Sequence, residues 1–243
     1  MAKERKTHEP HAPLSARLFA ELVGTFVLTF TAAGADIVDA LYPHGIGHVA
    51  RYLAPGIAVA AMIWALSGVS GAHINPAISL AFFFRRSFAA ALVGPYVVAQ
   101  LIGATAAALL LRLMFRGDIA LAITKPLLPF TPAQAFATET TLTAILAFVI
   151  LGTADQKAVV GKNAALAVGG IVAMCGLAFS PLSGASMNPA RTFGPMIASL
   201  HFPLGWTYAL APVLGAAIAA GVSWLIYGHP KEEARRAAEG HAG

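Results

Sequence analysis

The chain has 243 residues, of which 58% are hydrophobic and only 11% are charged. A soluble domain carries about 25% charged residues, so this composition excludes an ordinary soluble protein and indicates one that is embedded in a lipid bilayer. The formal net charge is +5, but the basic residues gather in short connecting segments and near the chain ends, and this placement argues against a nucleic-acid partner.

The chain begins with a polar segment and continues into long apolar ones. Residues 1–17 are rich in charge, and we expect a cytoplasmic tail there and no cleavable signal peptide. Residues 229–243 are polar again, and we expect a second solvated cytoplasmic tail. Between them lie six apolar segments long enough to cross about 30 Å of hydrocarbon at about 1.5 Å per residue. They run approximately Leu18–Ala35, Leu53–Val69, Phe88–Leu111, Ala133–Leu151, Ala164–Phe179 and Pro203–Ile226.

An eight-residue frame, Ser-Gly-Ala-x-x-Asn-Pro-Ala, occurs twice, as SGAHINPA from Ser70 to Ala77 and as SGASMNPA from Ser183 to Ala190. Asn is a strong N-cap and Pro is favoured at the first helical position, so each Asn-Pro pair predicts a helix start. The apolar stretches that follow, Asn75 to Phe84 and Asn188 to Leu200, each cover about half a bilayer. One copy would merely mark a helix boundary, but two copies favour two half-helices that enter the membrane without crossing it.

The two halves of the chain, 18–130 and 131–228, share more than this frame. Each half contains three spans, which is an odd number, so the second half enters the membrane inverted relative to the first. Such repeats place a transport site at the bilayer midplane. The sequence therefore predicts an all-α membrane protein with six transmembrane helices, two re-entrant half-helices and an inverted repeat. Corresponding polar residues are Glu21, Thr25 and Asp36 in the first half and Glu139, Thr143 and Asp155 in the second.

Most Lys and Arg residues fall on one side of this arrangement when the amino terminus is placed in the cytoplasm. We therefore expect both termini to be cytoplasmic and the protein to lie in the plasma (inner) membrane.

Two half-helices that enter from opposite sides meet at their amino ends, and each end carries about half a positive charge. Together they repel cations and protons. The carboxamides of Asn75 and Asn188 can cap their own helices and offer N–H donors to a lumen. Irregular backbone at this depth is tolerated where it lines a cavity. We expect the carbonyl groups of Gly71, Ala72, His73, Gly184, Ala185 and Ser186 to line it, which predicts a passive pore for water and small uncharged solutes.

Four ionisable residues within apolar surroundings leave alternatives open. Arg191 either lines the pore, where it would grip passing oxygens and reject cations, or is a structural residue tied to loop carbonyls. Glu21 and Glu139 are either proton-relay carboxylates or acceptors for the N–H groups of the dipping loops, and we favour the second role. His73 is better explained as a loop tether than as a metal ligand, because no second His or Cys stands at ligand spacing. The single cysteine, Cys175, also speaks against a thiolate metal site, and we expect no metal and no cofactor.

The sequence resembles the aquaporin and aquaglyceroporin family of major intrinsic proteins over about Leu18 to Tyr227. The residues that carry the resemblance are AELVGTF at Ala20–Phe26, SGAHINPA, AQLIGA at Ala99–Ala104 and SGASMNPARTFGP at Ser183–Pro195. The resemblance implies a homotetramer with one pore per subunit. It also implies pore roles for Arg191 and for the two motifs, Asn75-Pro76-Ala77 and Asn188-Pro189-Ala190. By analogy with the family, Glu139 would support the first loop near His73.

The resemblance also implies a filter of four residues, Pro55, Gly176, Ala185 and Arg191. This set matches neither the Phe, His, small, Arg set of strict water channels nor the Trp, Gly, Phe, Arg set of glycerol facilitators. Thr192 also departs from the Asp usual in glycerol facilitators. We therefore expect a wide, weakly polar constriction, which Tyr52 would narrow if it folded inward.

The function predicted from the sequence is a channel for water and small neutral solutes. The alternatives are a channel mainly for metalloid acids or glycerol, and a junctional membrane protein with a closed pore. An enzyme is the least supported class, because no nucleophile–base pair and no metal cluster is evident in the sequence.

Overall fold

The computed structural model describes residues 12–42, 45–156 and 161–240, and every regular element within these ranges is helical. Six helices in the described part of the chain are long and apolar enough to cross a membrane, which confirms the six predicted spans. The helices α1 and α2 run further toward their connecting loop than predicted. The six are α1 (Leu14–Leu41), α2 (Gly47–Ser70), α4 (Ala90–Met114), α5 (Pro132–Asp155), α7 (Ala164–Ser183) and α9 (Gly205–Tyr227).

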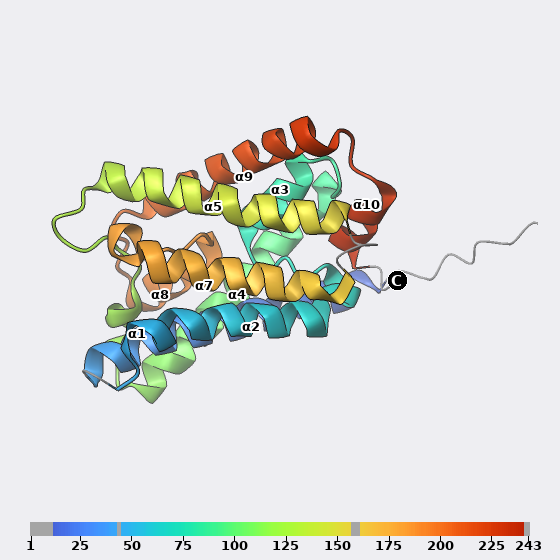
Figure 1. Cartoon of the computed structure of the whole chain (residues 1–243). Helices are drawn as coiled ribbons and strands as arrows, with labels where there is room; N and C mark the ends of the chain where they lie inside the picture. Colours follow the sequence, from blue (N-terminus) through green and yellow to red (C-terminus); the bar gives the residue numbers. More distant parts are fainter. Residues whose placement is uncertain (1–11, 43–44, 157–160, 241–243) are drawn as a thin grey trace, which may run out of the picture.

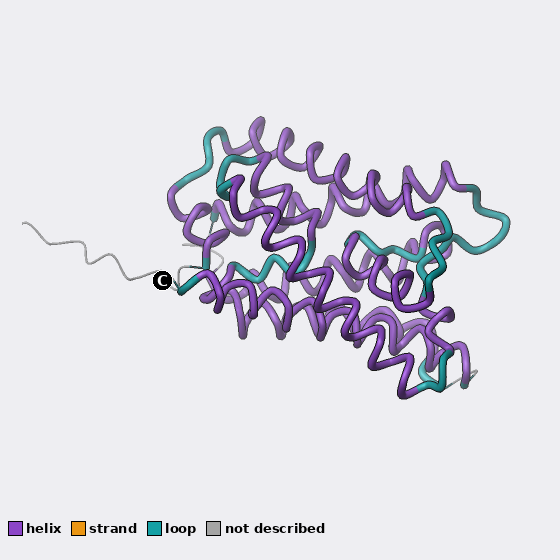
Figure 2. The backbone as a smooth tube through the Cα atoms, turned by 180° about the vertical axis from the view of Figure 1, so that it is seen from behind, coloured by secondary structure: helices purple, strands orange, loops and turns teal. Residues whose placement is uncertain are grey.

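Two short helices, α3 (Pro76–Phe84) and α8 (Pro189–Ser199), lie within the bundle near its opposite ends (Figure 1). Each begins at an Asn-Pro pair, because the Asn oxygen accepts a backbone hydrogen bond from the first turn. Asn75 Oδ1 accepts from the Ala77 N–H at 2.9 Å, and Asn188 Oδ1 accepts from the Ala190 N–H at 3.0 Å. The loops that precede these helices, residues 71–75 (the first loop) and 184–188 (the second loop), reach toward the middle of the bundle from its two ends (Figure 2). The helices α3 and α8 are the predicted re-entrant half-helices.

Small residues let the long helices approach closely where they cross. A Cβ atom on Gly56 of α2 would lie 2.6 Å from the Gly169 carbonyl oxygen of α7, and one on Gly215 of α9 would lie 2.5 Å from the Thr140 oxygen of α5. A Cβ atom would clash at these two contacts, so glycine lets the helix backbones approach closely there. These glycines therefore allow the close packing of α2 against α7 and of α9 against α5.

In each half of the chain, an equivalent hydrogen bond joins a long helix to the start of the loop in that half. The Tyr96 hydroxyl of α4 donates to the Ser70 carbonyl at 2.9 Å, and the Tyr208 hydroxyl of α9 donates to the Ser183 carbonyl at 2.5 Å. Ser70 and Ser183 open the two copies of the repeated frame. Each loop is therefore held at its start by a buried tyrosine from the third long helix of its half.

A buried ion pair ties the end of α3 to α5. Arg85 Nη2 lies 2.8 Å from Asp155 Oδ2, and both side chains are at most 2% exposed. Arg85 Nη1 also donates to the Gly228 carbonyl, just beyond α9. The ring of Trp224 packs on the same guanidinium. This arginine therefore connects three helices at one end of the bundle.

The segment after α9 is not the fully solvated tail predicted for 229–243. It forms α10 (Glu232–Glu239), whose Ala234 and Ala238 are buried. The Ala238 carbonyl is hydrogen-bonded to His73 Nε2 at 3.0 Å. Small residues four positions apart give α10 an apolar face that covers the first loop. Residues 241–243 and 1–11 of the predicted tails lie outside the described residues, and α1 already begins at Leu14.

Candidate functional site

A narrow cavity of about 60 Å³ lies between the two loops and four of the long helices. At roughly 10–15 Å³ for each water centre, it has room for a short row of water molecules. The helices contribute mostly apolar side chains spaced three or four residues apart, so each presents a single stripe. Apart from Arg51 of α2, which also lines the cavity, these residues are Leu28, Ala32 and Asp36 of α1, Tyr52, Pro55, Val59 and Ile63 of α2, Leu146 and Ile150 of α5, and Val168, Val172 and Gly176 of α7.

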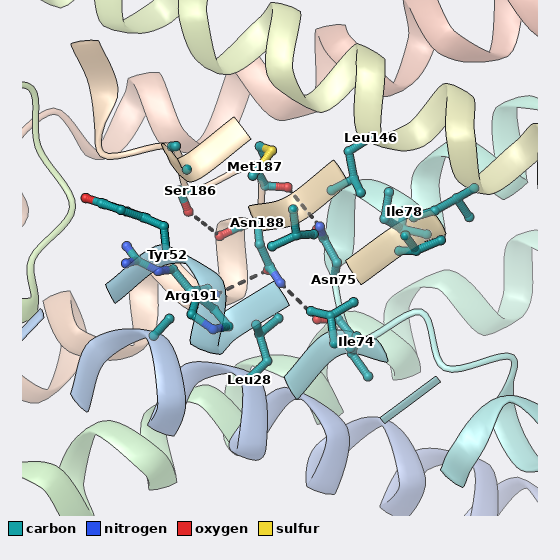
Figure 3. A pocket seen from close by; sticks show the side chains of 18 of the residues that line it. Leu28, Tyr52, Ile74, Asn75, Ile78, Leu146, Ser186, Met187, Asn188 and Arg191 are labelled. Carbon is teal, nitrogen blue, oxygen red and sulfur yellow. Dashed lines mark hydrogen bonds between the residues drawn. The ribbon is translucent and has the colours of Figure 1, made fainter. Parts of the chain in front are cut away.

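The two repeated asparagines face this cavity from opposite sides and are bonded to the opposite loop (Figure 3). Asn75 Nδ2 donates to the Met187 carbonyl at 2.8 Å, and Asn188 Nδ2 donates to the Ile74 carbonyl at 2.9 Å. Each carboxamide has two N–H groups, and these bonds use one of them. The structure thus brings the amino ends of α3 and α8 together, and it adds a pair of cross-loop bonds that the sequence did not predict.

The other motif residues lie behind the asparagines. Pro76 and Ala77 are buried in the first turn of α3, and Pro189 and Ala190 are buried in the first turn of α8. Ala77 and Ala190 have no exposed surface. Ala77 and Ala190 are not among the residues that line the cavity, whereas Asn75 and Asn188 present polar groups to it.

Most of the predicted carbonyl residues line the cavity. Ala72 and His73 line it from the first loop, and Gly184, Ala185 and Ser186 line it from the second. Gly71 does not, because its Cα lies against α10: a Cβ there would be 2.5 Å from the Ala238 oxygen. Ile74 and Met187, which were not predicted, also line the cavity.

Both loops have a strained backbone that must be held in place. Ala72, Ile74, Ala185 and Met187 all have positive φ angles, between 44° and 53°. Non-glycine residues rarely adopt this conformation, and it costs free energy. Such a loop is stable only when the surrounding structure fixes its hydrogen bonds.

Each loop is fixed by one buried glutamate. Glu21 Oε1 accepts from Ser70 Oγ and from the His73 N–H, and its Oε2 accepts from the Ile74 N–H and from Gln100 Nε2, all at 2.7–2.9 Å. His73 is itself bonded through Nδ1 to Ser79 Oγ at 3.0 Å. Glu21 has no exposed surface, so its carboxylate serves the first loop and does not face the cavity.

Glu139 makes the corresponding bonds to the second loop. Its Oε1 accepts from Ser183 Oγ at 2.7 Å and from the Ser186 N–H at 2.8 Å, and its Oε2 accepts from the Met187 N–H at 2.7 Å. The expectation that Glu139 supports the first loop near His73 is therefore wrong. Glu21 occupies that place, because α1 packs beside the first loop in the same way that α5 packs beside the second.

At one end of the cavity, Arg191 is held by side chains from two other segments. Arg191 is the third residue of α8. Its Nη2 lies 2.7 Å from Asp36 Oδ2, and its Nη1 donates to Thr124 Oγ1. The other carboxylate oxygen of Asp36 accepts from Arg51 Nε at 2.6 Å. Arg191 thus faces the cavity, but its charge is paired with a carboxylate.

The remaining predicted filter residues, Pro55, Gly176 and Ala185, also line the cavity near Arg191. Tyr52 of α2 narrows the expected wide opening, because its ring folds inward beside these small residues. A Cβ on Gly176 would lie 2.6 Å from the Tyr52 ring, and Tyr52 is only 8% exposed. Tyr52 stands three residues before Pro55 and therefore faces the same side of the helix.

The signature of one protein family covers almost the whole chain. The family described as Major intrinsic protein matches residues 10–224. The chain belongs to this family. It is 38% identical over 213 residues to Aquaporin NIP3-1 of Oryza sativa subsp. japonica, a match that covers 88% of this chain and 68% of the relative. It is 36% identical over 211 residues to Nodulin-26 of Glycine max, covering 86% and 77% respectively.

A solved structure shares the same fold. The X-ray structure of the aquaglyceroporin from Plasmodium falciparum superposes with a TM-score of 0.80 at 26% identity, covering 86% of this chain and 95% of that one. Together with the six membrane-spanning helices, these relationships make this major intrinsic protein an integral membrane channel for water and small neutral solutes.

Besides Ile74 and Met187, the sequence did not reveal that Asp36 and Arg51 line the cavity of this major intrinsic protein, or that Thr124 accepts a hydrogen bond from Arg191. In the sequence, Asp36 is marked only as the counterpart of Asp155 in the repeat. A charged residue in an apolar span is itself a signal, since such residues are rarely found without a partner or a function. The partner, Arg191, lies 155 positions away in the sequence and could not be assigned from the sequence.

Proposed function

We propose that water and small neutral solutes pass in single file through the cavity between Asn75 and Asn188, and that protons and cations are excluded there. One observation carries this proposal: the amino ends of α3 and α8, with both asparagine carboxamides, face one shared cavity (Figure 3). The residues of the two loops and the mostly apolar stripes of four helices together line this cavity. Solutes would therefore find hydrogen-bonding partners along a single line.

The exclusion of protons follows from the polarity of the midpoint. Each half-helix contributes about half a positive charge at its amino end. The second N–H of each carboxamide is a donor, so a water at the midpoint is oriented to accept from both. A water held in this way cannot pass a proton along the file, and the positive ends repel cations.

The selectivity filter comprises Tyr52, Pro55, Gly176, Ala185 and Arg191. The first of these, Tyr52, occupies the space that the small side chains leave open, which favours water and the smallest neutral solutes. We therefore expect this filter to select neutral solutes by their size and to distinguish poorly between neutral solutes of similar size.

We expect Tyr52→Ala to raise glycerol and boric acid flux several-fold, and to raise water flux much less, because the substitution removes the ring that stands against Gly176. The measurement is stopped-flow light scattering on proteoliposomes challenged in turn with sucrose, glycerol, urea and boric acid. Tyr42→Ala is the matched control, since Tyr42 is exposed and does not line the cavity.

The same assay tests the proposed path itself. Wild-type vesicles should shrink in sucrose faster than empty vesicles while remaining tight to protons and sodium. Water flux equal to that of empty vesicles would refute the path, and solute flux unchanged by Tyr52→Ala would refute the place of the filter.

We extend the proposal to assembly and orientation. The protein lies in the lipid bilayer of the plasma (inner) membrane, with both termini in the cytoplasm. It forms a homotetramer with one pore in each subunit. The large exposed apolar side chains of the long helices, among them Leu113, Leu214 and Leu225, supply surface for lipid and for neighbouring subunits. Native mass spectrometry of the purified protein tests the tetramer, and labelling of a C-terminal cysteine in intact cells tests the orientation.

A further inference from the structure

The cavity is lined by groups that attract anions as well as repel cations. The amino ends of α3 and α8 point into it, and helix amino ends are ready-made anion sites. Arg191 and Arg51 line the same cavity. A second, wider pocket of about 230 Å³ adjoins it at this end and is lined by Arg191, Arg51 and Lys125. A path built from these groups alone would draw chloride in.

Asp36 is the one carboxylate among the residues that line either pocket. Its two oxygens face the two arginines, Oδ2 at 2.7 Å from Arg191 and Oδ1 at 2.6 Å from Arg51. The side chains of Asp36 and Arg191 are each only 8% exposed, so water screens this pair weakly. The carboxylates of the loop glutamates, Glu21 and Glu139, are occupied by loop hydrogen bonds.

We propose that Asp36 is the anion-rejecting residue of the channel, because its carboxylate cancels the attraction that Arg191 and the helix ends exert on a small anion. This inference rests on the proposed path through the cavity. Arg191 then acts chiefly as a hydrogen-bond donor and as part of the wall, and its charge is balanced where solutes pass. With Asp36 neutral, Arg191 keeps its bond to Thr124 but loses its counter-charge.

The nearby Asp39 provides a matched control. It lies one helical turn from Asp36 on α1, and it also contacts Arg51, at 3.4 Å. Asp39 does not line either pocket and is 24% exposed. Asp36→Asn and Asp39→Asn therefore make the same chemical change, and each removes one negative charge beside Arg51. Only Asp36→Asn removes that charge from the lining of the cavity.

The experiment measures halide entry and water flux in the same batch of proteoliposomes. A chloride-quenched dye is trapped inside, and the membrane potential is clamped with valinomycin and potassium. We expect Asp36→Asn to raise chloride influx about tenfold or more, because an unbalanced charge at close range in a protein interior changes ion energies by more than thermal energy. Asp39→Asn should remain at the wild-type level, and Asp36→Glu should stay tight to chloride.

Each outcome supports or overturns the inference. If Asp36→Asn conducts water but excludes chloride, Asp36 is a structural tether only and the inference is wrong, while the path stands. If Asp39→Asn leaks chloride equally, the effect does not depend on the lumen and the inference is also wrong. Asp36→Ser serves as a second neutral variant in case the asparagine variant does not fold. If neither folds and Asp39→Asn does, the carboxylate is a folding requirement and the inference fails. A wild-type protein that passes no water contradicts the proposed path instead.

Discussion

Replacing Glu139 with leucine is expected to unfold the second loop and to leave little correctly folded channel. The substitution removes the acceptor for the Ser186 and Met187 N–H groups and for Ser183 Oγ. Each buried donor left unsatisfied costs about 1–3 kcal/mol, so the loss is on the order of 3–9 kcal/mol for the three. Glu139 has no exposed surface, so bulk water has no access to the place where its oxygens accept these bonds. Fluorescence-detected size-exclusion chromatography after heating measures the loss.

Two variants calibrate this result. Glu139→Gln keeps one acceptor oxygen but points an N–H group at loop donors, so we expect an intermediate melting temperature. Glu232→Leu changes an exposed glutamate of α10 that lies 3.9 Å from Arg236 Nε, and it should cost about 1 kcal/mol or less. A leucine variant that melts with the wild type would mean that Glu139 does not hold the loop.

Asp155→Ala is expected to destabilise the fold by about 3–5 kcal/mol, because it leaves the Arg85 guanidinium buried without its counter-ion. The pair is 2.8 Å apart and almost fully buried. Unfolding in detergent, followed by circular dichroism, measures the change. Asp39→Ala is the control, since its contact with Arg51 is longer and partly exposed, and it should cost about 1 kcal/mol or less.

The double variant Arg85→Leu/Asp155→Leu separates the cost of an unpaired charge from the value of the pair. Among residues 12–42, 45–156 and 161–240, Arg85 Nε and Asp155 Oδ1 have no hydrogen-bond partner, so the pair is incompletely satisfied there. Apolar replacements of such pairs are often nearly neutral, and we expect the double variant to melt closer to the wild type than Asp155→Ala does. If the double variant is as unstable as the single one, the desolvation argument is wrong.

The half-helices could be predicted from the sequence because their signals are local. An Asn-Pro pair specifies a helix start through one side chain and the next turn, and Asn75 and Asn188 both behave in this way. The spans were equally predictable, since length and hydropathy decide them. The direction of the second half followed from the odd number of spans.

Contacts between distant segments were not predictable. Nothing near Asp36 indicates that its partner is Arg191, and nothing near Ala238 indicates that its carbonyl meets His73, 165 positions away. The analogy assigned Glu139 to the wrong loop for the same reason, because support depends on which helix packs beside which loop. The sequence allows the ring of Tyr52 to fold inward, but only its packing against Gly176 decides that it lies in the cavity.

Solutes are proposed to cross through the cavity that Asn75 and Asn188 share. Val172 of α7 lines this cavity, whereas Leu166 of the same helix is 56% exposed and does not line it. In a Cys175→Ser background, Val172→Cys and Leu166→Cys are each treated with a bulky thiol reagent, and water flux is followed by stopped flow. We expect reagent to abolish most of the protein-dependent flux of the Val172→Cys channel and to leave that of Leu166→Cys unchanged. Full water flux through a Val172→Cys channel that mass spectrometry shows to be fully labelled would contradict the account.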